Sequence, residues 1–307
     1  MGLATFRGGV HPFEGKELSM DRAVTVLKPT SGEMVYPLSQ HIGAPAKAIV
    51  KVGDEVLVGQ KIAEAGGFIS AVVVSSVSGK VKKIEPRVTA GGAKSISIVI
   101  ENDGLYTAVE GLGEDRDATK LSKQEIRDIV REAGIVGLGG AGFPTNVKLT
   151  PKDESKIDYV IVNGAECEPY LTCDYRMMIE EPERLVGGLK VMLQLFENAK
   201  AVIGIENNKP KAIEKLRALV KDEPKITVEP LRTKYPQGGE RSLIYAVTGR
   251  EINSSMLPAD AGCVVDNVNT VMAIYDAVCK RTPILERVIT VTGDAVKERR
   301  TSRSEPA

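Results

Sequence analysis

The chain has 307 residues, with 41 Lys and Arg side chains against 41 Asp and Glu side chains, so its formal net charge is zero. This length predicts two domains of roughly 100–200 residues, and 42% hydrophobic residues suffice for two cores. A neutral chain lacks the positive charge that neutralises phosphates, so we expect no nucleic-acid partner. We expect no membrane span and no secretory signal, because no apolar run approaches the roughly 18–20 residues that cross a bilayer. Only two histidines, His11 and His41, argue against a multi-histidine metal site and a Ser–His–Asp relay.

The four cysteines indicate a reducing compartment. Cys167 and Cys173 form a C-x5-C pair, whereas Cys263 and Cys279 are distant single residues. This spacing matches neither a zinc knuckle nor an iron–sulfur run, and a chain of this size needs no disulfide. We therefore predict no metal ligands, and we interpret Cys263 and Cys279 as small packing residues.

Residues 1–32 show no clear periodicity and are predicted to form an N-terminal arm. Residues 33–103 contain short Val/Ile runs at regular spacing, with glycine turns at Gly53-Asp54 and Gly66-Gly67. This pattern predicts a small all-β module, either a closed barrel or a sandwich. Its candidate strands are 48–52, 55–58, 70–74, 79–84 and 95–100.

After a polar linker at 102–119, residues 120–296 alternate between helical and strand patterns. A capping box at Ser122–Glu125 opens the first helix. Strands are predicted at 159–162, 201–205 and 226–231, and helices at 182–198, 210–220, 241–247 and 268–279. Strands separated by helices predict parallel βαβ units, so the fold class is α/β with an open, mostly parallel sheet. Such sheets bind ligands beyond the carboxyl ends of their strands.

A glycine-rich loop spans residues 134–142, and Gly137, Gly139 and Gly142 formally satisfy G-x-G-x-x-G. A helix precedes the loop and a proline follows it, so the strand–turn–helix context of the dinucleotide fingerprint is missing. Backbone N–H groups without Cβ atoms nevertheless let a phosphate or a flat ring approach closely. The alternative is a tight helix–loop connection. Lys148 follows the loop and could neutralise a phosphate, or it is an ordinary exposed lysine.

Three further polar segments are expected at element ends of the same domain. Asn163–Pro169 brings two carboxylates, an amide and a thiol to the end of a strand; the alternative is a solvated turn. Tyr235–Ser242 is a second glycine turn before a helix, where an anion, a flavin edge or a plain N-cap would fit. Asp266–Thr270 opens another helix, with N-capping by Asp266 or Asn267 as its alternative. Because these segments and the glycine loop converge, we predict a nucleotide or flavin pocket.

At these residues the chain resembles a known family. The NADH- and FMN-binding fold of the complex I 51-kDa flavoprotein is similar at Gly139–Thr145, Val162–Pro169, Gly238–Glu240 and Asp266–Thr270. A closer similarity, to the RnfC family of the Rnf complex, an ion-translocating ferredoxin:NAD oxidoreductase, is carried by Phe6–Pro12 and Glu166–Arg176. The resemblance covers residues 1–296.

The resemblance implies which residues contact each cofactor. For FMN it implies Gly137, Gly139, Gly140, Gly142, Lys148, Asn163, Glu166, Gly238, Gly239, Asp266 and Asn267. For NADH it implies Phe143, Glu168 and Glu240. The 51-kDa flavoprotein has an acidic pair where this chain has Gly239-Glu240, so the first carboxylate is missing. The flavin carries the chemistry, and no side chain is predicted to be catalytic.

The β module resembles a lipoyl/biotinyl barrel-sandwich hybrid at 50–56, 59–62 and 76–81. A carrier domain needs a lysine at its hairpin tip, and no lysine lies between Ile62 and Gly79. We therefore predict a docking or packing module.

The implied function is that of an Rnf flavoprotein module, in which NAD(H) and FMN exchange a hydride and 4Fe–4S clusters then carry electrons, indirectly to or from ferredoxin. The implied partners are NADH and other Rnf subunits, and the implied place is cytoplasmic, peripheral on the inner face of the cell membrane. The family's cluster-binding cysteine runs are missing, and residues 297–307 are predicted to be a disordered tail, so we expect a truncated chain. The alternatives are a non-catalytic docking or assembly fragment and a cobalamin-reductase-like flavoprotein.

Overall fold

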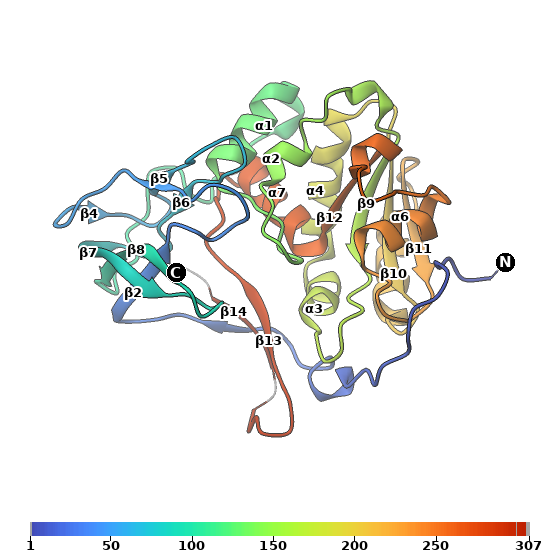
Figure 1. Cartoon of the computed structure of the whole chain (residues 1–307), viewed down its shortest axis with the longest axis horizontal. Coiled ribbons are helices and arrows are strands. Elements are labelled where there is room, and N and C mark those ends of the chain that lie inside the picture. The colour runs from blue at the N-terminus through green and yellow to red at the C-terminus, as the bar shows by residue number, and fades with distance from the viewer. Residues whose placement is uncertain (1, 299, 305–307) are drawn as a thin grey trace. The chain divides into compact units, whose positions relative to one another are not determined.

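The computed structural model describes residues 2–298 and 300–304 (Figure 1). Its contacts divide the chain into two compact units. The α/β unit comprises Met1–Thr25, Leu149–Tyr275 and Val288–Ser302, and the barrel unit comprises Val26–Lys148, Asp276–Arg287 and Arg303–Ala307. Each unit is therefore built from segments that are distant in the sequence.

The α/β unit is organised around a four-stranded parallel sheet in the order β11-β10-β9-β12. The strands are β9 (Tyr159–Gly164), β10 (Lys200–Glu206), β11 (Ile226–Leu231) and β12 (Cys263–Asn267). All but one residue of β10 are buried, as is typical of a parallel strand covered on both faces. The predicted α/β class with an open parallel sheet is confirmed.

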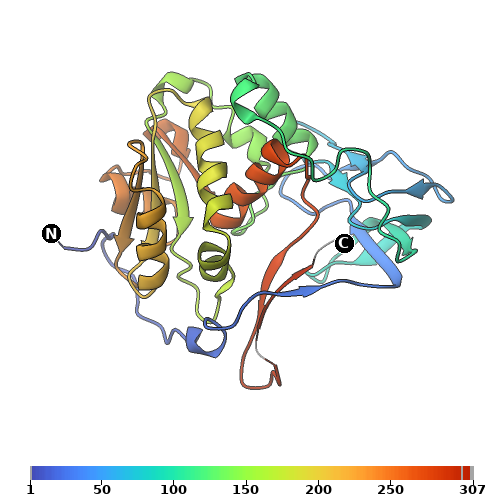
Figure 2. The same ribbon diagram turned by 180° about the vertical axis from the view of Figure 1, so that it is seen from behind.

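Helices cover both faces of this sheet. They are α3 (Cys173–Glu180), α4 (Pro182–Leu195), α5 (Pro210–Leu219), α6 (Glu240–Thr248) and α7 (Val268–Cys279). Leu243 and Ile244 of α6 pack against Ile161 on one face, and α6 lies in front of the sheet in Figure 1. The helices α4 and α5 lie in front of it in the reverse view of Figure 2.

The barrel unit contains two small antiparallel sheets around one apolar core. One sheet has the order β2-β8-β7-β4, and the other has the order β3-β5-β6. The strands are β2 (Gly32–Pro37), β3 (Lys47–Ala48), β4 (Glu55–Val56), β5 (Lys61–Glu64), β6 (Val73–Val74), β7 (Gly79–Val88) and β8 (Lys94–Asn102). Ile62 from one sheet and Ile98 and Ile100 from the other are fully buried in this core. The predicted barrel-sandwich module is confirmed.

The glycine-rich loop belongs to the barrel unit by its contacts. It connects α1 (Lys123–Glu132), which opens with the predicted Ser122–Glu125 capping box, to the short α2 (Thr145–Lys148). The sequence boundary instead assigned residues 120–148 to the α/β domain. The boundaries 1–32, 33–103 and 120–296 stay predictions.

A third sheet has the order β1-β14-β13. Its strands are β1 (Thr25–Leu27), β13 (Val288–Val291) and β14 (Arg300–Ser304). We expected a disordered tail at 297–307, but residues 300–304 form β14, while 299 and 305–307 lie outside the described residues. Thr301 is fully buried, and its Oγ1 lies 3.1 Å from Oγ1 of Thr172. Pairing with β1 and β13 and the Thr301–Thr172 hydrogen bond hold this polar segment, which a count of apolar residues does not anticipate.

The remaining elements are single turns of 3-10 helix at Lys16–Leu18, Ala118–Lys120, Glu154–Lys156 and Pro258–Ala261. None of the helices within 2–298 is long and apolar enough to cross a membrane.

Candidate functional site

Asn163 lies at the carboxyl end of β9, where neighbouring strands end in register with it. It pairs with Gly204 of β10 on one side and with Asn267 of β12 on the other. Its Nδ2 donates to the carbonyl oxygen of Gly238 over 2.8 Å, and its Oδ1 accepts from the amide of Ala165 over 3.3 Å. Asn163 therefore holds the second glycine turn, which contains Gly238, against the end of β9.

The second glycine turn packs closely against this strand end. The amide of Gly238 donates to Sγ of Cys167 over 3.2 Å. A Cβ atom on Gly238 would lie 3.2 Å from Oδ1 of Asn163 and 3.3 Å from Sγ of Cys167, which is tighter than ordinary packing. Gly239 is the N-cap residue of α6, and Glu240 begins that helix. Burial raises the pKa of Cys167 to about 11, so this thiol stays protonated at neutral pH.

Glu166 is buried at the start of α3. Its Oε1 accepts from the amide of Asp174 over 2.7 Å and its Oε2 from the amide of Tyr175 over 3.4 Å, so it caps the helix. Its backbone has a φ of 47°, an uncommon left-handed conformation for a residue other than glycine. Burial, followed by the nearby Asp174 carboxylate, raises the pKa of Glu166 to about 8.

Asp174 is a polar residue of this region that the sequence patterns did not single out. Its two carboxylate oxygens accept hydrogen bonds from Nδ2 of Asn267 over 2.7 Å and Nδ2 of Asn269 over 2.6 Å. Burial raises its pKa to about 6. The amide of Asn267, predicted to contact a flavin, therefore donates to Asp174. Asp266 is buried immediately before it at the end of β12.

A buried ion pair follows β10 and was also missed. Lys209 is fully buried, and its Nζ donates to the carbonyl oxygen of Ala165 over 2.6 Å and lies 3.5 Å from Oε2 of Glu206. Burial raises the pKa of Glu206. The signal that could have found the pair is the polar run 206–209 directly after a strand, which is the pattern that identified Asn163.

The N-terminal arm crosses both predicted ligand-contact segments of the α/β unit. Nζ of Lys16 donates to the carbonyl oxygens of Glu168 over 3.0 Å and Leu171 over 2.7 Å. Val10 and Tyr235 exchange backbone hydrogen bonds of 2.8 Å in both directions. The motif Phe6–Pro12, which carried the closer family resemblance, is thus a structural part of this site.

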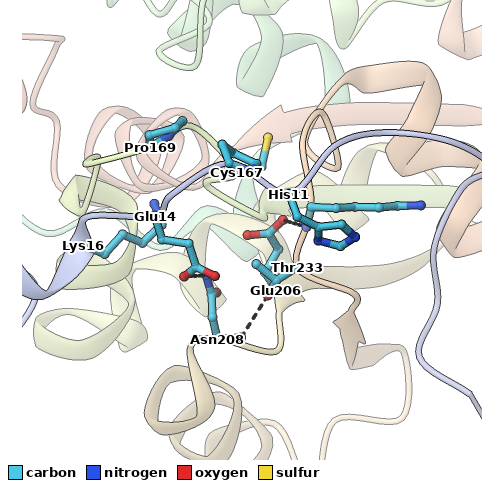
Figure 3. Close-up of a pocket in the computed structure, with 10 residues that line it drawn as sticks. His11, Glu14, Lys16, Cys167, Pro169, Glu206, Asn208 and Thr233 are labelled. Carbon is cyan, nitrogen blue, oxygen red and sulfur yellow. Dashed lines mark hydrogen bonds between the residues drawn. The ribbon is translucent and has the colours of Figure 1, made fainter.

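The N-terminal arm and the ends of the strands together border a small hollow (Figure 3). Oε2 of Glu14 accepts from Nδ2 of Asn208 over 2.7 Å across it. The hollow is lined by His11, Pro12, Glu14, Lys16, Cys167, Pro169, Glu206, Asn208, Thr233 and Lys234.

In the barrel unit, the glycine loop presents its middle to solvent. The amide of Gly137 donates to the carbonyl oxygen of Phe143 over 2.8 Å, which closes the loop. Gly139 and Gly140 are exposed, and no atom lies within 4 Å of a Cβ built on Gly140. Gly142 has a φ of 65°, and its Cβ would lie 3.2 Å from Cα of His41.

The predicted contacts therefore form two sets. Within the α/β unit, the structure brings Asn163, Glu166 and Gly238 together, with Glu168, Gly239, Glu240, Asp266 and Asn267 on the same or adjoining segments. Gly137, Gly139, Gly140, Gly142, Phe143 and Lys148 belong to the barrel unit.

Two buried polar atoms at the glycine turns test whether a ligand fits. Oγ1 of Thr145, just after the first turn, and Nε2 of Gln237, in the second, have no hydrogen-bond partner among the described residues. An unsatisfied buried polar group costs about 1–3 kcal/mol, so such groups are rare unless a ligand or water completes them. Taken separately, Thr145 and the exposed glycines of the loop suit a phosphate in the barrel unit, and the NH₂ group of Gln237 suits an acceptor atom of a polar-edged ring in the α/β unit.

One cluster in the described part of the chain has the composition of a metal site. Ligand atoms of Glu166, Cys173 and Asp174 lie within 4.8 Å of one another. Their carboxylate oxygens already accept amide hydrogen bonds at the start of α3 and from Asn267 and Asn269. Because a cation would compete with these donors, we assign no metal to the cluster.

Two family models match the chain. Residues 130–276 match the Nuo51 FMN-binding domain, and residues 4–105 match the RnfC barrel sandwich hybrid domain. The first match contains every predicted FMN and NADH contact.

Curated relatives match almost the whole chain. It is 47% identical over 296 residues to the C subunit of the proton-translocating ferredoxin:NAD(+) oxidoreductase complex of Clostridium ljungdahlii, covering 96% of this chain and 64% of that protein. It is 46% identical over 303 residues to the C subunit of the Na(+)-translocating ferredoxin:NAD(+) oxidoreductase complex of Acetobacterium woodii, covering 97% and 67%. The C subunit of an ion-translocating oxidoreductase complex of Haemophilus influenzae is 38% identical, covering 97% and 46%. The chain thus spans about two thirds or less of the length of these relatives.

Among solved structures, an NAD+-reducing [NiFe]-hydrogenase matches with a TM-score of 0.52 and 24% identity, covering 62% of this chain and 37% of that chain. This similarity shows the fold.

Proposed function

The chain belongs to the RnfC family, the C subunits of ion-translocating ferredoxin:NAD(+) oxidoreductase complexes, and from this premise we propose that it binds FMN and exchanges a hydride between NAD(H) and the flavin. The observation that carries the proposal is the match of residues 130–276 to an FMN-binding domain. The exposed Gly139 and Gly140 and the unsatisfied atoms of Thr145 and Gln237 support it independently.

When bound, FMN supplies the ring that accepts or returns the hydride. The residues of the chain hold and orient this ring and the nucleotide. We propose that Gly137, Gly139, Gly140, Gly142 and Lys148 bind the phosphate end, and that Asn163, Glu166, Gly238, Gly239, Asp266 and Asn267 border the ring and its side chain. No side-chain acid or base is needed for a hydride transfer, and the protonated thiol of Cys167 is no nucleophile.

We propose that Phe143, Glu168 and Glu240 bind the nicotinamide nucleotide. Glu168 and Glu240 are exposed. Glu168 directly follows Cys167, and Glu240 lies two residues after Gly238, so the hydrogen bond between Gly238 and Cys167 joins the two segments that carry them. Exposed carboxylates at strand and helix ends are suited to accept hydrogen bonds from ribose hydroxyl groups.

The wider role follows from the family. We propose that the chain works with other subunits of an Rnf-type complex as a cytoplasmic protein on the inner face of the cell membrane. Electrons would pass between the flavin and 4Fe–4S clusters, and indirectly to or from ferredoxin. The cysteines of this chain lie on separate elements, so we assign those clusters to other parts of the complex.

A binding experiment tests the proposal. The purified chain is mixed with FMN, and quenching of flavin fluorescence is followed as the protein concentration rises. We expect saturable binding and NADH-dependent reduction of ferricyanide. If the chain binds no FMN, or if it binds FMN and shows no reaction with NADH, the proposal is wrong.

A docking role without catalysis is the second candidate. The observation that favours it is the exposure of large apolar side chains on the barrel unit, where Phe68 is 84% and Leu105 is 76% exposed. NADH:ferricyanide activity that is absent, or that Gly140→Val leaves unchanged, would favour this candidate over the first.

A further inference from the structure

Gln237 is a fully buried amide in the second glycine turn, and no predicted contact includes it. Its Oε1 accepts a hydrogen bond from Oγ1 of Thr5 over 3.2 Å. Its backbone amide donates to the carbonyl oxygen of Lys234 over 3.0 Å. Only Nε2, among the polar atoms of its side chain, lacks a partner within the described residues. The side chain therefore offers an unused NH₂ group.

The N-terminal arm brings Thr5 to the amide oxygen of Gln237. Arg232 donates its backbone amide to the carbonyl oxygen of Ala4 over 3.0 Å, and Nζ of Lys234 donates to the carbonyl oxygen of Gly8 over 2.9 Å. These bonds place Thr5 beside Gln237. In this arrangement the Thr5 hydroxyl donates to the amide oxygen, and the NH₂ group of Gln237 is left to bind another acceptor.

The turn that carries Gln237 is itself held in place. The carbonyl oxygen of Gly238 accepts a hydrogen bond from Asn163, and its amide donates one to Cys167. A buried donor on such a turn cannot relax toward water, and it destabilises the chain until an acceptor arrives. The edge of a flavin ring carries carbonyl oxygens and ring nitrogens that accept hydrogen bonds.

We propose that Nε2 of Gln237 donates a hydrogen bond to an acceptor atom on the ring edge of the bound flavin, and that Thr5 is the positioning residue that aims it. This inference rests on the proposed FMN binding and adds a contact to it. Reduction places negative charge on the flavin ring, and hydrogen bonds to a charged acceptor are stronger than those to a neutral one. Gln237 therefore also makes the reduced flavin more stable.

The test compares Gln237→Met with the unchanged chain. Removing an unsatisfied buried donor leaves the melting temperature of the flavin-free protein unchanged or higher, whereas the Kd for FMN rises about 3- to 10-fold, the effect of one lost hydrogen bond. The midpoint potential of the bound flavin becomes more negative. A residue that only stabilises the fold would instead lower the melting temperature.

Two further variants test the role of Thr5 and of glutamine chemistry in general. Thr5→Val shifts the flavin potential in the same direction by a smaller amount, and Thr5→Ser restores it, because serine keeps the hydroxyl. Gln124→Met changes an exposed glutamine of α1 and leaves all readouts unchanged.

Three results would overturn the inference. They are an unchanged FMN Kd and potential in Gln237→Met, a rise in the KM for NADH alone, and a lower melting temperature of the flavin-free variant with an unchanged potential. If the unchanged chain binds no FMN, the proposed function fails first, and the two failures are therefore distinguishable.

Discussion

At the scale of residues, the carboxyl groups of Glu166 and Asp174 lie buried together at the start of α3. Burial raises the pKa of both, to about 8 for Glu166 and about 6 for Asp174. Each carboxyl group therefore holds its proton more tightly in the folded chain than in the unfolded chain. Such groups contribute stability at low pH that is lost as the pH rises.

This sign gives a prediction for Glu166→Gln. Between its ordinary pKa of 4.5 and about 8, the folded protein binds more protons at this site than the unfolded protein, so the wild-type melting temperature should fall through this window. The variant should show a shallower fall, most clearly above pH 6, where Asp174 has titrated. Melting temperatures measured across this range check the prediction, and parallel curves for the two proteins would contradict it.

A second residue-scale prediction concerns Gly140. A Cβ atom there meets no atom within 4 Å and the residue is exposed, so Gly140→Val should keep the melting temperature of the flavin-free chain. Its side chain would occupy the space in which a ligand approaches the loop, and FMN affinity should fall about tenfold or more. Titration of fluorescence quenching measures this.

Gly91→Val is the matched control for Gly140→Val, since Gly91 lies in a turn of the same unit with its nearest atom at 4.0 Å. It should bind FMN as the unchanged chain does. Equal affinities for both variants would show that the glycine loop does not contact the flavin.

At the scale of elements, the N-terminal arm supports the segment that contains Glu168. Lys16 is buried and bonds the carbonyl oxygens of Glu168 and Leu171. Lys16→Met keeps most of the apolar part of the side chain and removes the two hydrogen bonds that Nζ donates. We expect the KM for NADH to rise about threefold or more while the Kd for FMN stays unchanged, because only the NADH-binding segment loosens.

Steady-state kinetics and FMN titration of the same preparation separate these two effects. Lys221→Met, at an exposed lysine, is the control for the loss of charge. A change in FMN affinity without a change in KM would contradict a role for the arm at Glu168.

The strand β14 gives a second prediction at this scale. Thr301 and Ser302 are buried, and Thr301 bonds to Thr172. Backbone amides of 300–304 should therefore exchange with solvent more slowly than those of a free peptide, as measured by hydrogen–deuterium exchange. Exchange at the free-peptide rate would restore the sequence-based prediction of a disordered tail.

At the scale of the whole molecule, the alternation of strands and helices was enough to predict the parallel sheet and the polar residues at its edge. Asn163 could be found because it follows a buried strand, and the family was identified from its motifs and is confirmed by the relatives. The same pattern extends to Lys209, which closes the polar run 206–209 after a strand. Lys16 could not be found in this way, because a lysine normally lies on the surface and only tertiary contacts bury this one.

The same limit applies to the arm and to the glycine loop. No periodicity marks residues 1–25, because the arm is held by hydrogen bonds to distant segments such as those of Tyr235 and Glu168. The contacts of the glycine loop with the barrel, such as Gly142 with His41, join segments about a hundred residues apart, beyond any local pattern.

Hydride exchange between NADH and the bound flavin can be measured by an anaerobic titration of the FMN-loaded chain with NADH, followed by the visible absorbance of the flavin. We expect NADH to bleach this absorbance and added NAD⁺ to restore part of it. At an FMN concentration near the Kd of the unchanged chain, the Gly140→Val variant should bind less flavin and show a correspondingly smaller change. A bound flavin whose spectrum does not respond to NADH would contradict the account.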